Sequence, residues 1–362
     1  MNNNEKSLII AINPGSTSTK IAIYDHSKAV WRCIIRHATA EIARYNNISE
    51  QLPFRKQLIM EQLDIAGMDW SSLRAVIGRG GMIKPVASGV YLVNELMKEH
   101  LHSGFQGQHA SNLGGLIAAD IAALCPQTVP AYIADPVVVD ELQPYARVAG
   151  HPLFERRSVF HALNQKAVAR IYARETGIPY EELNLVVAHL GGGISVGAHC
   201  RGQVIDVNQA LDGEGPFSPE RSGTLPVGQL VDLCFSGDYT QNDVAAMING
   251  KGGLTALCSS NNVQQLIGDA QSGNRHTQFV LETMCYQVAK ETGAMSAVLK
   301  GKVDGIILTG GIAYSEWITD KIAQYVSFIA PVHVYPGEDE MAALAMNAQM
   351  ALSGEISIKE YL

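Results

Sequence analysis

Three glycine-rich stretches have the composition of phosphate-binding turns. They cover residues 13–20, 189–195 and 309–312, and each follows an apolar run that is typical of a buried strand. Backbone N–H groups that no Cβ shields bind a phosphate well, so glycine-rich turns beside strands or helices often form such sites. A single turn of this kind carries little weight in a chain with 34 glycines. Three of them in comparable positions indicate a phosphate site.

The first stretch, "INPGSTSTKIAIYD" at residues 12–25, has two interpretations. Asn13, Pro14 and Gly15 are common turn formers, and Gly15 can adopt a positive φ without steric cost, which predicts a β-hairpin. The same small residues leave backbone N–H groups and hydroxyls available to a phosphate. A P-loop is excluded because the second glycine before Lys20 is missing and a strand follows instead of a helix. No G-x-G-x-x-G follows a strand either, so the dinucleotide-binding fold lacks its fingerprint.

The elements around these turns predict an α/β fold. Two segments, 7–35 and 183–206, each have the order strand, turn, strand, turn, strand, and a further buried strand is expected within 304–313. Apolar residues at three- and four-residue spacing predict helices at 56–66, 111–124, 161–176, 227–235, 277–300 and 338–353. Strands that alternate with helices, and a hairpin pattern that occurs twice, indicate two α/β domains with similar cores.

The composition limits the class of protein. A chain of 362 residues exceeds the roughly 250 residues at which a single core stops growing, which favours two domains. Its 47% hydrophobic and 17% charged residues fit a globular enzyme, and a net charge of −8 argues against nucleic acid or an anionic membrane as the main partner. Six cysteines without a C-x-x-C pair indicate neither a disulfide framework nor a zinc ribbon. We find no leader pattern and no run of ~20 apolar residues, so a cytoplasmic location is expected.

In chain order, the motifs resemble those of the acetokinase family, within the acetate and sugar kinase, Hsp70 and actin superfamily. Residues 12–25 look like the family's first signature, and "VFHALNQKAVAR" at 159–170 stands where its second lies. Four more segments complete the set: "VIGRGG" at 76–81, "AHLGGGISV" at 188–196, "PERSGTLPVG" at 219–228 and "YPGEDEMAALA" at 335–345. Together the motifs span almost the whole chain.

The resemblance implies a particular fold and division of the chain. It implies two ribonuclease-H-like domains of the actin-like ATPase type, each a mixed β-sheet flanked by helices, with a cleft between them. The expected domains are 1–155, completed by the C-terminal segment 341–362, and 156–340. Closure around the substrate is also expected, because water must be kept from an acyl phosphate.

Details of the motifs are similar to the butyrate kinase branch of the family. Acetate kinases usually carry Asn-Ala-Gly, His-Gly-Gly and Gly-Asn-Gly, where this chain has Asn-Pro-Gly at 13–15, Arg-Gly-Gly at 79–81 and Gly-Gly-Gly at 191–193. The resemblance implies reversible phosphoryl transfer from ATP to the carboxylate of butyrate, giving ADP and butyryl phosphate. Acetate, propionate and branched acids stay open as substrates, because a pocket distinguishes one methylene by only ~1–3 kcal/mol. The apolar residues between 82 and 86 fit either a substrate pocket or the core.

The resemblance also implies which residues act. Arg79 and Arg221 match arginines that flank the transferring group, and Arg79 also binds the substrate; a planar guanidinium suits both tasks. His161 matches a histidine that steadies the phosphoryl group, Asp135 an aspartate that orients the acyl phosphate or the metal, and His109 a residue near the substrate. From the residues alone, a surface salt bridge, a core histidine and a strand-end turn are the alternative explanations of these side chains. The expected nucleotide- and phosphate-binding residues are Asn13, Gly15, Ser16, Thr17, Ser18, His189, Gly191, Gly192, Gly193, Gly310 and Gly311.

An acidic run before the last expected helix is the candidate magnesium site. The resemblance implies ATP/ADP with Mg²⁺, and this ion keeps several waters and takes few protein oxygens. Glu338 and Asp339 are the candidates, with Glu340 left open, although acids at a helix start also serve the helix dipole alone. The histidines show no zinc-binding spacing. The family likeness further implies a homodimer or a higher homo-oligomer.

A protein of another class stays as the alternative. ATP-switch and sensor proteins of the actin and Hsp70 kind share the phosphate loops. Their activities do not require two arginines, a histidine and an aspartate around a small carboxylate. Their filaments or peptide-binding domains also need additional sequence. We therefore expect an ATP-dependent carboxylate phosphotransferase.

Overall fold

The chain divides into two compact units in the computed structural model, which describes residues 6–362. Unit 1 comprises the described residues through Val139 together with Asp339–Leu362, and unit 2 is Asp140–Glu338. The boundaries expected from the sequence are 155/156 and 340/341. In both descriptions the C-terminal segment joins the N-terminal part of the chain.

Unit 1 is built on a seven-stranded mixed sheet in the order β12-β5-β6-β4-β1-β2-β3. Its strands are β1 (Leu8–Pro14), β2 (Ser18–Asp25), β3 (Lys28–Arg36), β4 (Leu73–Arg79), β5 (Val90–Leu92), β6 (Ala131–Ala134) and β12 (Ile358–Lys359). The strands β1, β2 and β3 form the antiparallel meander that the sequence predicts, whereas β1, β4 and β6 run parallel. The parallel strands therefore end at one common edge of the sheet.

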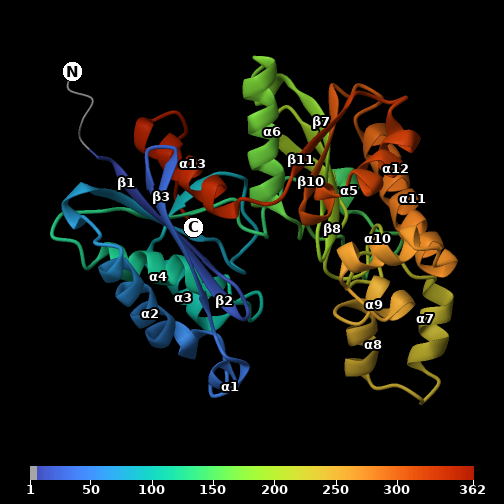
Figure 1. Ribbon diagram of the computed structural model, residues 1–362, viewed down its shortest axis with the longest axis horizontal. Helices are drawn as coiled ribbons and strands as arrows, with labels where there is room; N and C mark the ends of the chain where they lie inside the picture. The colour runs from blue at the N-terminus through green and yellow to red at the C-terminus, as the bar shows by residue number, and fades with distance from the viewer. Residues whose placement is uncertain (1–5) are drawn as a thin grey trace. The chain divides into compact units, whose positions relative to one another are not determined.

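Helices cover both faces of this sheet (Figure 1). They are α1 (Thr39–Ile42), α2 (Leu52–Ile65), α3 (Glu95–Ser103), α4 (Asn112–Ala122) and α13 (Glu340–Ser353), with 3₁₀ turns at Ser49–Gln51 and Trp70–Ser72. Strand β1 is buried along its whole length because α4 and α13 both pack on it, which explains its nearly continuous apolar sequence. A Cβ at Gly78 would overlap the main chain of Gly114, so this pair of glycines lets α4 approach β4 closely.

Unit 2 repeats the pattern with a five-stranded mixed sheet in the order β11-β10-β7-β8-β9. Its strands are β7 (Asn184–Leu190), β8 (Ile194–Cys200), β9 (Gln203–Val207), β10 (Gly305–Gly310) and β11 (Val332–Pro336). The antiparallel meander β7–β8–β9 corresponds to β1–β2–β3 of unit 1, as the repeated hairpin pattern predicts. Strands β7, β10 and β11 are parallel and end at one edge.

Helix α6 packs on β7 and β10 of unit 2, while α11 packs on β8 and β7 together with α12 (Figure 1). The helices are α5 (Pro144–Arg147), α6 (Ala162–Thr176), α7 (Val227–Cys234), α8 (Gln241–Ile248), α9 (Gly253–Cys258), α10 (Val263–Gln271), α11 (Arg275–Val298) and α12 (Glu316–Val326), with 3₁₀ turns at Tyr180–Glu182 and Gly311–Tyr314. All six helices expected from periodicity are present, with ends shifted by a few residues. Within residues 6–362 every helix is too short or too polar to cross a membrane.

The start of α13 differs from the sequence prediction. The helix begins at Glu340, and Asp339 is its N-cap, whose side chain accepts a hydrogen bond from the N–H of Ala342 at 2.9 Å. Glu338 precedes the helix and belongs to unit 2. Of the three acids expected in the first turn, only Glu340 lies in it, because the Asp339 side chain satisfies one of the free N–H groups at the helix start.

Candidate functional site

Three predicted site residues lie at the carboxyl edge of the unit 1 sheet. Asn13 is the penultimate residue of β1, Arg79 ends β4, and Asp135 follows β6 directly. Since β1, β4 and β6 are parallel neighbours, their ends bring these side chains to one edge. Ligands of open α/β sheets bind outside the carboxyl ends of the strands, so the topology alone marks this edge as a candidate site.

Glu340 joins two of these residues. The side-chain amide of Asn13 donates to its Oε2, and Arg79 Nη1 lies 3.2 Å from its Oε1. The Arg79 and Glu340 side chains are 23% and 12% exposed, so the pair is only partly screened by water. Asp339 points elsewhere, because its carboxylate pairs with Arg32 at 3.0 Å. Glu340 is therefore the acid of the 338–340 run that meets the predicted site residues of unit 1.

Asp135 has a strained backbone and a fixed carboxylate. Its φ is +38°, in the left-handed region that non-glycine residues rarely adopt. The Ser88 hydroxyl and the Gly89 N–H donate to Oδ1 at 2.6 and 2.8 Å, and the residue is 2% exposed. A Cβ at Gly80 would lie 2.6 Å from Pro136 Cβ, so the glycine after Arg79 allows the two loops to touch. The strand-end turn that the sequence offers as an alternative is present, and it holds the carboxylate in a fixed position.

The turn after β1 has the expected hairpin bond, from the Gly15 N–H to the Ser18 carbonyl at 2.7 Å. The expected use of a positive φ at Gly15 is wrong, since this residue is absent from the positive-φ glycines. A Cβ there would meet its nearest neighbour at 3.5 Å, an ordinary contact. A positive φ at Gly15 therefore does not explain the conformation of this turn.

Arg55 forms hydrogen bonds to the main chain of this turn. This residue of α2 has a fully buried side chain. Its Nη1 donates to the carbonyls of Gly15 (2.7 Å) and Ser18 (3.2 Å), and its Nη2 donates to the carbonyl of Ser16 (3.0 Å). In a planar trans peptide the N–H points opposite to the C=O. With the carbonyls of Gly15 and Ser16 drawn toward Arg55, the N–H groups of Ser16 and Thr17 face the other way.

Burial lowers the pKa of Arg55 to about 10, which still leaves the guanidinium charged at neutral pH. Its remaining hydrogen bonds go to the uncharged acceptors Gln51 Oε1 and Thr19 Oγ1. No carboxylate among residues 6–362 pairs with it. An uncompensated positive charge therefore lies beneath the turn, where it attracts an anion on the exposed side.

A buried histidine beside this turn makes unit 1 sensitive to acid. His37 Nε2 is 2.8 Å from Thr19 Oγ1, and burial, with a smaller contribution from the Arg55 charge, lowers the pKa of His37 from 6.5 to about 4. The unfolded state therefore binds more protons between pH 6.5 and 4. We expect the free energy of unfolding to fall as the pH drops through this window, with up to about 3 kcal/mol due to His37.

Denaturant unfolding of the native protein and of His37→Asn at several pH values measures this contribution. The difference in unfolding free energy between the two should shrink from pH 7 to pH 4, because only the native protein must exclude that proton. A difference that stays constant across the window would contradict the assignment.

His109 lies three residues before α4. Its Nδ1 is 2.8 Å from Ser111 Oγ, and the Ser111 N–H also points at it from 3.2 Å. Asn112, at the helix start, accepts from the Met82 N–H at 2.8 Å, and a Cβ at Gly81 would touch the same residue. The helix start that follows His109 therefore packs against the loop that follows Arg79.

The carboxyl edge of the unit 2 sheet gathers a second set of predicted residues. His189 is in β7, Gly310 ends β10, and Glu338 follows β11. Gly310 has a φ of +91°, and a Cβ there would overlap the Leu190 carbonyl, so the position requires glycine. Gly311 begins a 3₁₀ turn in open space, and the backbones of Gly310 and Gly337 exchange two hydrogen bonds at 3.1 and 2.9 Å.

Arg221 lies against the triple-glycine loop of unit 2. A Cβ at Gly193 would overlap its guanidinium, so the missing side chain makes room for the arginine. Nη1 donates to the Ala210 carbonyl at 2.6 Å. Burial lowers the pKa of Arg221, while the nearby charges of Glu220 and Asp212 act in the opposite direction. The arginine thus places a positive charge against residues 191–193, which lie far from it in the sequence.

Two histidine rings stack in the same unit. The His161 and His189 rings are 3.8 Å apart between centroids and nearly parallel, at 9°. His161 Nδ1 is 2.9 Å from Ser195 Oγ, and His189 Nδ1 is 2.8 Å from Asn164 Oδ1. The other ring nitrogen of His189, Nε2, is 3.5 Å from the Glu338 carboxylate. Two imidazolium ions at this separation repel each other, which favours at most one charged ring.

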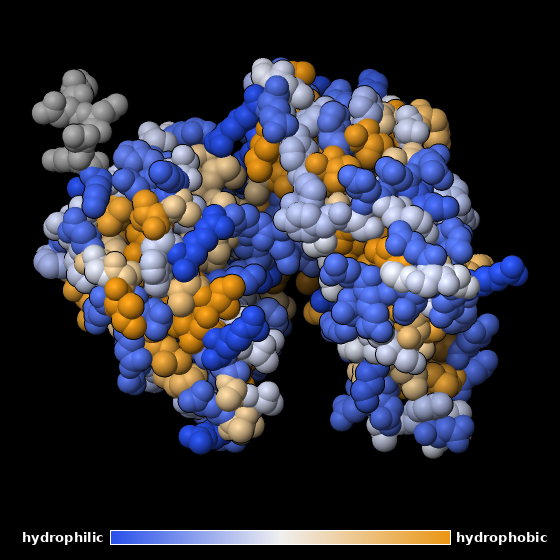
Figure 2. Space-filling view, in the orientation of Figure 1, coloured by the Kyte–Doolittle hydropathy of each residue, from blue (hydrophilic) through white to orange (hydrophobic). Residues whose placement is uncertain are grey.

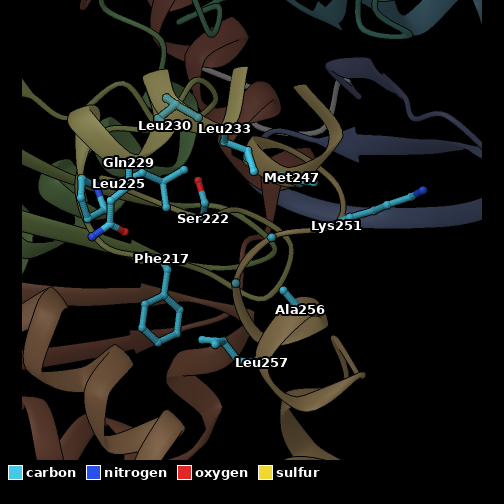
Figure 3. Close-up of a pocket in the computed structure, with 13 residues that line it drawn as sticks. Phe217, Ser222, Leu225, Gln229, Leu230, Leu233, Met247, Lys251, Ala256 and Leu257 are labelled. Atoms are coloured by element: carbon cyan, nitrogen blue, oxygen red, sulfur yellow. The ribbon is translucent and has the colours of Figure 1, made fainter. Parts of the chain in front are cut away.

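Unit 2 also contains an apolar cavity of about 470 Å³ (Figure 3). Leu230 and Leu233 border it on one side and Phe217 and Leu257 on another, while Lys251 points away. The full lining is Phe217, Ser222, Leu225, Pro226, Gln229, Leu230, Leu233, Met247, Lys251, Gly252, Gly253, Ala256 and Leu257. Apolar side chains also reach the surface near this end of unit 2, among them the exposed residues of α7 (Figure 2). The cavity adjoins the Arg221 loop but contains none of the predicted site residues.

Sequence reasoning missed Arg55 and the polar residues that contact His161. A signal for Arg55 exists, because it shares helical i, i+4 and i+8 spacing with the buried Ile59 and Leu63, which places it on the apolar face of α2. Ser195 is the last residue of the candidate stretch 189–195, and Gln165 lies in the motif 159–170, but nothing in the local sequence indicates that either supports His161.

Solved structures establish the fold class. The crystal structure of acetate kinase from Porphyromonas gingivalis is similar with a TM-score of 0.78 at 17% identity, covering 96% of this chain and 100% of that one. Acetate kinase from Entamoeba histolytica gives 0.71 at 18% identity, covering 93% and 98%. The chain therefore has the actin-like ATPase fold of these enzymes, with two mixed sheets flanked by helices, as expected from the sequence.

Sequence comparisons specify the family. The model of the acetokinase family matches residues 146–330. Butyrate kinases 1 and 2 of Clostridium acetobutylicum are 54% and 53% identical over 353 residues, covering 98% of this chain and 99% of each relative. The chain belongs to the acetokinase family, which confirms the resemblance seen in its motifs.

Proposed function

We propose that the protein is a butyrate kinase, which transfers a phosphoryl group reversibly between ATP and the carboxylate of butyrate. The observation that carries the proposal is the identity of 54% over nearly the full length of both chains with butyrate kinase 1. The products are ADP and butyryl phosphate. Both substrates are anions, so catalysis requires cations and N–H donors that hold them and neutralise charge as it spreads over the phosphoryl oxygens.

The carboxyl edge of unit 1 supplies groups for the carboxylate and for the nucleotide. Arg79 binds the substrate carboxylate through the two parallel donors of its guanidinium, exchanging its bond to Glu340. Asn13 and the turn 15–18, braced by Arg55, bind phosphate oxygens through N–H groups and hydroxyls. Asp135, with its carboxylate fixed by Ser88 and Gly89, orients the acyl phosphate or the metal.

The residues of unit 2 are suited to bind the phosphate groups of the nucleotide. The N–H groups of Gly192, Gly193 and Gly311 are suited to bind phosphate oxygens, whereas those of Gly191 and Gly310 donate to main-chain carbonyls. Arg221 neutralises charge that develops on the transferring phosphoryl group. His161 donates a hydrogen bond to the same group. Because these contacts strengthen as charge develops, their loss lowers kcat more than it raises KM.

Magnesium is the metal that ATP chemistry requires, and the residues present fit it. Among residues 6–362 no cluster of three or more histidine, cysteine or acidic side chains could enclose an ion. An ion that keeps its waters and takes one or two carboxylates needs no such cluster. Glu340 is the best placed acid, because Asp339 caps α13 and Glu338 lies beside His189. Bound magnesium supplies positive charge to the phosphates, and Glu340 would hold it through water.

A hydroxamate assay tests the function. Purified protein, ATP, Mg²⁺ and each straight or branched acid from two to five carbons are incubated with hydroxylamine, which traps an acyl phosphate as a coloured hydroxamate. We expect turnover, with the highest kcat/KM for butyrate. Product from none of the acids would refute the kinase and favour an ATP switch. A preference for acetate or propionate would move the protein to those kinases.

We also propose the homo-oligomeric state that the family likeness implies, a homodimer or larger. Light scattering coupled to gel filtration measures it directly. A mass equal to the 39.0 kDa of one chain would contradict it.

A further inference from the structure

A chain of hydrogen bonds runs from His161 into the interior of unit 2. It passes from His161 Nδ1 to Ser195 Oγ (2.9 Å), from there to Gln165 Nε2 (2.8 Å), from Gln165 Oε1 to His199 Nε2 (2.9 Å), and from His199 Nδ1 to the Tyr180 hydroxyl (2.7 Å). Ser195, Gln165 and His199 are each 0% exposed. A buried polar group without a partner is costly, so each donor in this chain of bonds constrains the next.

The main chain fixes the direction of the Gln165 amide. Its Nε2 lies 3.0 Å from the carbonyl of Ser195, which can only accept. The reverse orientation would place two oxygens against each other at that distance. One N–H of Gln165 therefore goes to the carbonyl and the other to Ser195 Oγ, while Oε1 faces His199.

His199 is neutral and has a defined tautomer. Burial lowers its pKa well below 6.5, with the charges of Lys166 and Arg170 acting in the same direction. Because Gln165 Oε1 is an acceptor, His199 must carry its proton on Nε2. Its Nδ1 is then an acceptor, and the Tyr180 hydroxyl donates to it. The bond from His199 therefore holds the Gln165 amide in the same orientation that its bond to the Ser195 carbonyl requires.

The fixed orientation of the Gln165 amide determines which hydrogen bonds the Ser195 hydroxyl makes. Its oxygen accepts from Gln165, and the His161 main-chain N–H lies 3.5 Å away. Among residues 6–362, His161 Nδ1 is the one acceptor within reach of its hydrogen. If Nδ1 carried a proton instead, the buried hydroxyl would have no acceptor, which is costly.

We infer that Ser195, oriented by Gln165 and His199, holds His161 in the neutral tautomer that carries its proton on Nε2. The inference rests on the proposed function, in which His161 donates a hydrogen bond to the phosphoryl group. With Nδ1 committed as an acceptor, Nε2–H is the only donor that the ring can offer. Ser195 and Gln165 are thus positioning residues, and they supply a donor of fixed position without adding a second charge.

The stacked ring fits the same assignment. His189 lies beside the Glu338 carboxylate, whereas His161 meets a hydroxyl donor. Since two stacked cations repel, the ring next to the acid is the one that can hold an additional proton. A neutral His161 then stacks on it without repulsion.

A glycine makes space for this arrangement. A Cβ at Gly197 would lie 2.6 Å from Gln165 Oε1 and 3.4 Å from His199 Nε2. Gly197 has no positive φ that would otherwise require glycine. Its lack of a side chain is explained by the amide that occupies the space.

Long-range ¹H–¹⁵N NMR on protein labelled at histidine nitrogens tests the inference without turnover. In the native protein at pH 8, His161 should show a pyridine-type Nδ1 and a pyrrole-type Nε2, with its signals assigned by their loss in His161→Gln. The opposite pattern, with the proton on Nδ1, would overturn the inference. This measurement needs neither substrate nor a positioning variant, so it stands or falls separately from the butyrate kinase assay.

Ser195→Ala provides the kinetic test. Removing the hydroxyl should allow both His161 tautomers and lower kcat about 10- to 100-fold with little change in the KM for butyrate. Ser296→Ala is the matched control, since Ser296 is also a buried serine of unit 2, but its hydroxyl donates to the Thr292 carbonyl within α11 and contacts none of the proposed site residues that the structure describes. It should change neither the tautomer nor kcat. An unchanged tautomer in Ser195→Ala, whatever its kcat, would reduce Ser195 to a structural residue and overturn the inference.

The two amide replacements of His161 distinguish the ring nitrogens. In His161→Gln the side-chain N–H₂ can reach the place of Nε2, whereas in His161→Asn it reaches only the place of Nδ1. We expect His161→Gln to retain at least tenfold more kcat than His161→Asn. Equal activities would contradict a donor at Nε2.

Discussion

Replacing Arg221 with alanine is expected to lower kcat about 10³-fold while the protein stays folded. The guanidinium lies where a Cβ on Gly193 would be and donates to the Ala210 carbonyl, so its position next to the loop 191–193 is fixed before substrate binds. A preorganised cation that meets charge developing in the transition state typically contributes 10²- to 10⁵-fold. Steady-state kinetics with ATP and butyrate, and a thermal melt of the same sample, measure both parts of the prediction.

The fold should survive this substitution because the loop has other supports. The Ser218 N–H donates to the Arg221 carbonyl, and the Ser222 N–H to that of Ile248, each at 3.0 Å, and neither bond uses the arginine side chain. Burial lowers the pKa of Arg221, so the protein loses a charge that was costly to desolvate. If the variant had the melting temperature and the kcat of the native protein, the assignment of Arg221 to the site would be wrong.

Arg147→Ala is the matched control for Arg221. Arg147 is also an arginine of unit 2, and both of its terminal nitrogens bind Asp140 at 2.7 Å. It lies outside the proposed site, so kcat should stay within twofold of the native value. The loss of this partly exposed pair should cost about 1 kcal/mol or less of unfolding free energy. A large fall in kcat here would show that the assay reports stability instead of chemistry.

The elements of this fold could be predicted because their signals are local. Alternating and helical periodicities lie within ten or twenty residues, so both hairpins and six helices follow from the sequence. The parallel pairing of β1, β4 and β6 joins strands that are up to about 120 residues apart. No local pattern reports that pairing, yet it is what brings Asn13, Arg79 and Asp135 to one edge.

The family motifs predict which residues form the site, but they do not predict the contacts among those residues. Gly193 and Arg221 each lie in a motif, but their contact appears only once the chain is folded. The hydrogen bonds of Ser195 to Gln165 and His161 join residues 30 and 34 positions apart, and a serine in a strand has many alternative partners. Asp339 was a reasonable metal candidate as an acid in an acidic run, but helix capping and Arg32 use its oxygens.

Replacing Arg55 with methionine is expected to give the largest loss of stability, about 3–5 kcal/mol of unfolding free energy. Methionine fills part of the space but removes the donors that now bind the buried Gln51 Oε1 and the partly buried carbonyls of Gly15 and Ser16. The Ser18 carbonyl keeps the N–H of Gly15. Unpaired buried polar groups cost about 1–3 kcal/mol each, partly offset because the buried charge also disappears. Denaturant unfolding followed by circular dichroism measures the change.

The same variant should bind nucleotide less tightly. Without Arg55 the turn 15–18 loses both the constraint that turns its N–H groups outward and the positive charge beneath it. We expect the dissociation constant for ATP, measured by calorimetry under conditions where the variant is folded, to rise about tenfold or more. Arg55→Lys, which keeps a charge but lacks the planar fork, should fall between the methionine variant and the native protein.

Lys56→Met provides the control from the next position of the same helix. Lys56 pairs with Asp120 at 2.7 Å, and both side chains are more than a third exposed, so its loss should cost less than about 1 kcal/mol and leave ATP affinity unchanged. The contrast between neighbouring cations isolates burial and the bonds to the turn as the cause. If Arg55→Met were as stable and bound ATP as tightly as Lys56→Met, Arg55 would have no role in shaping the phosphate turn.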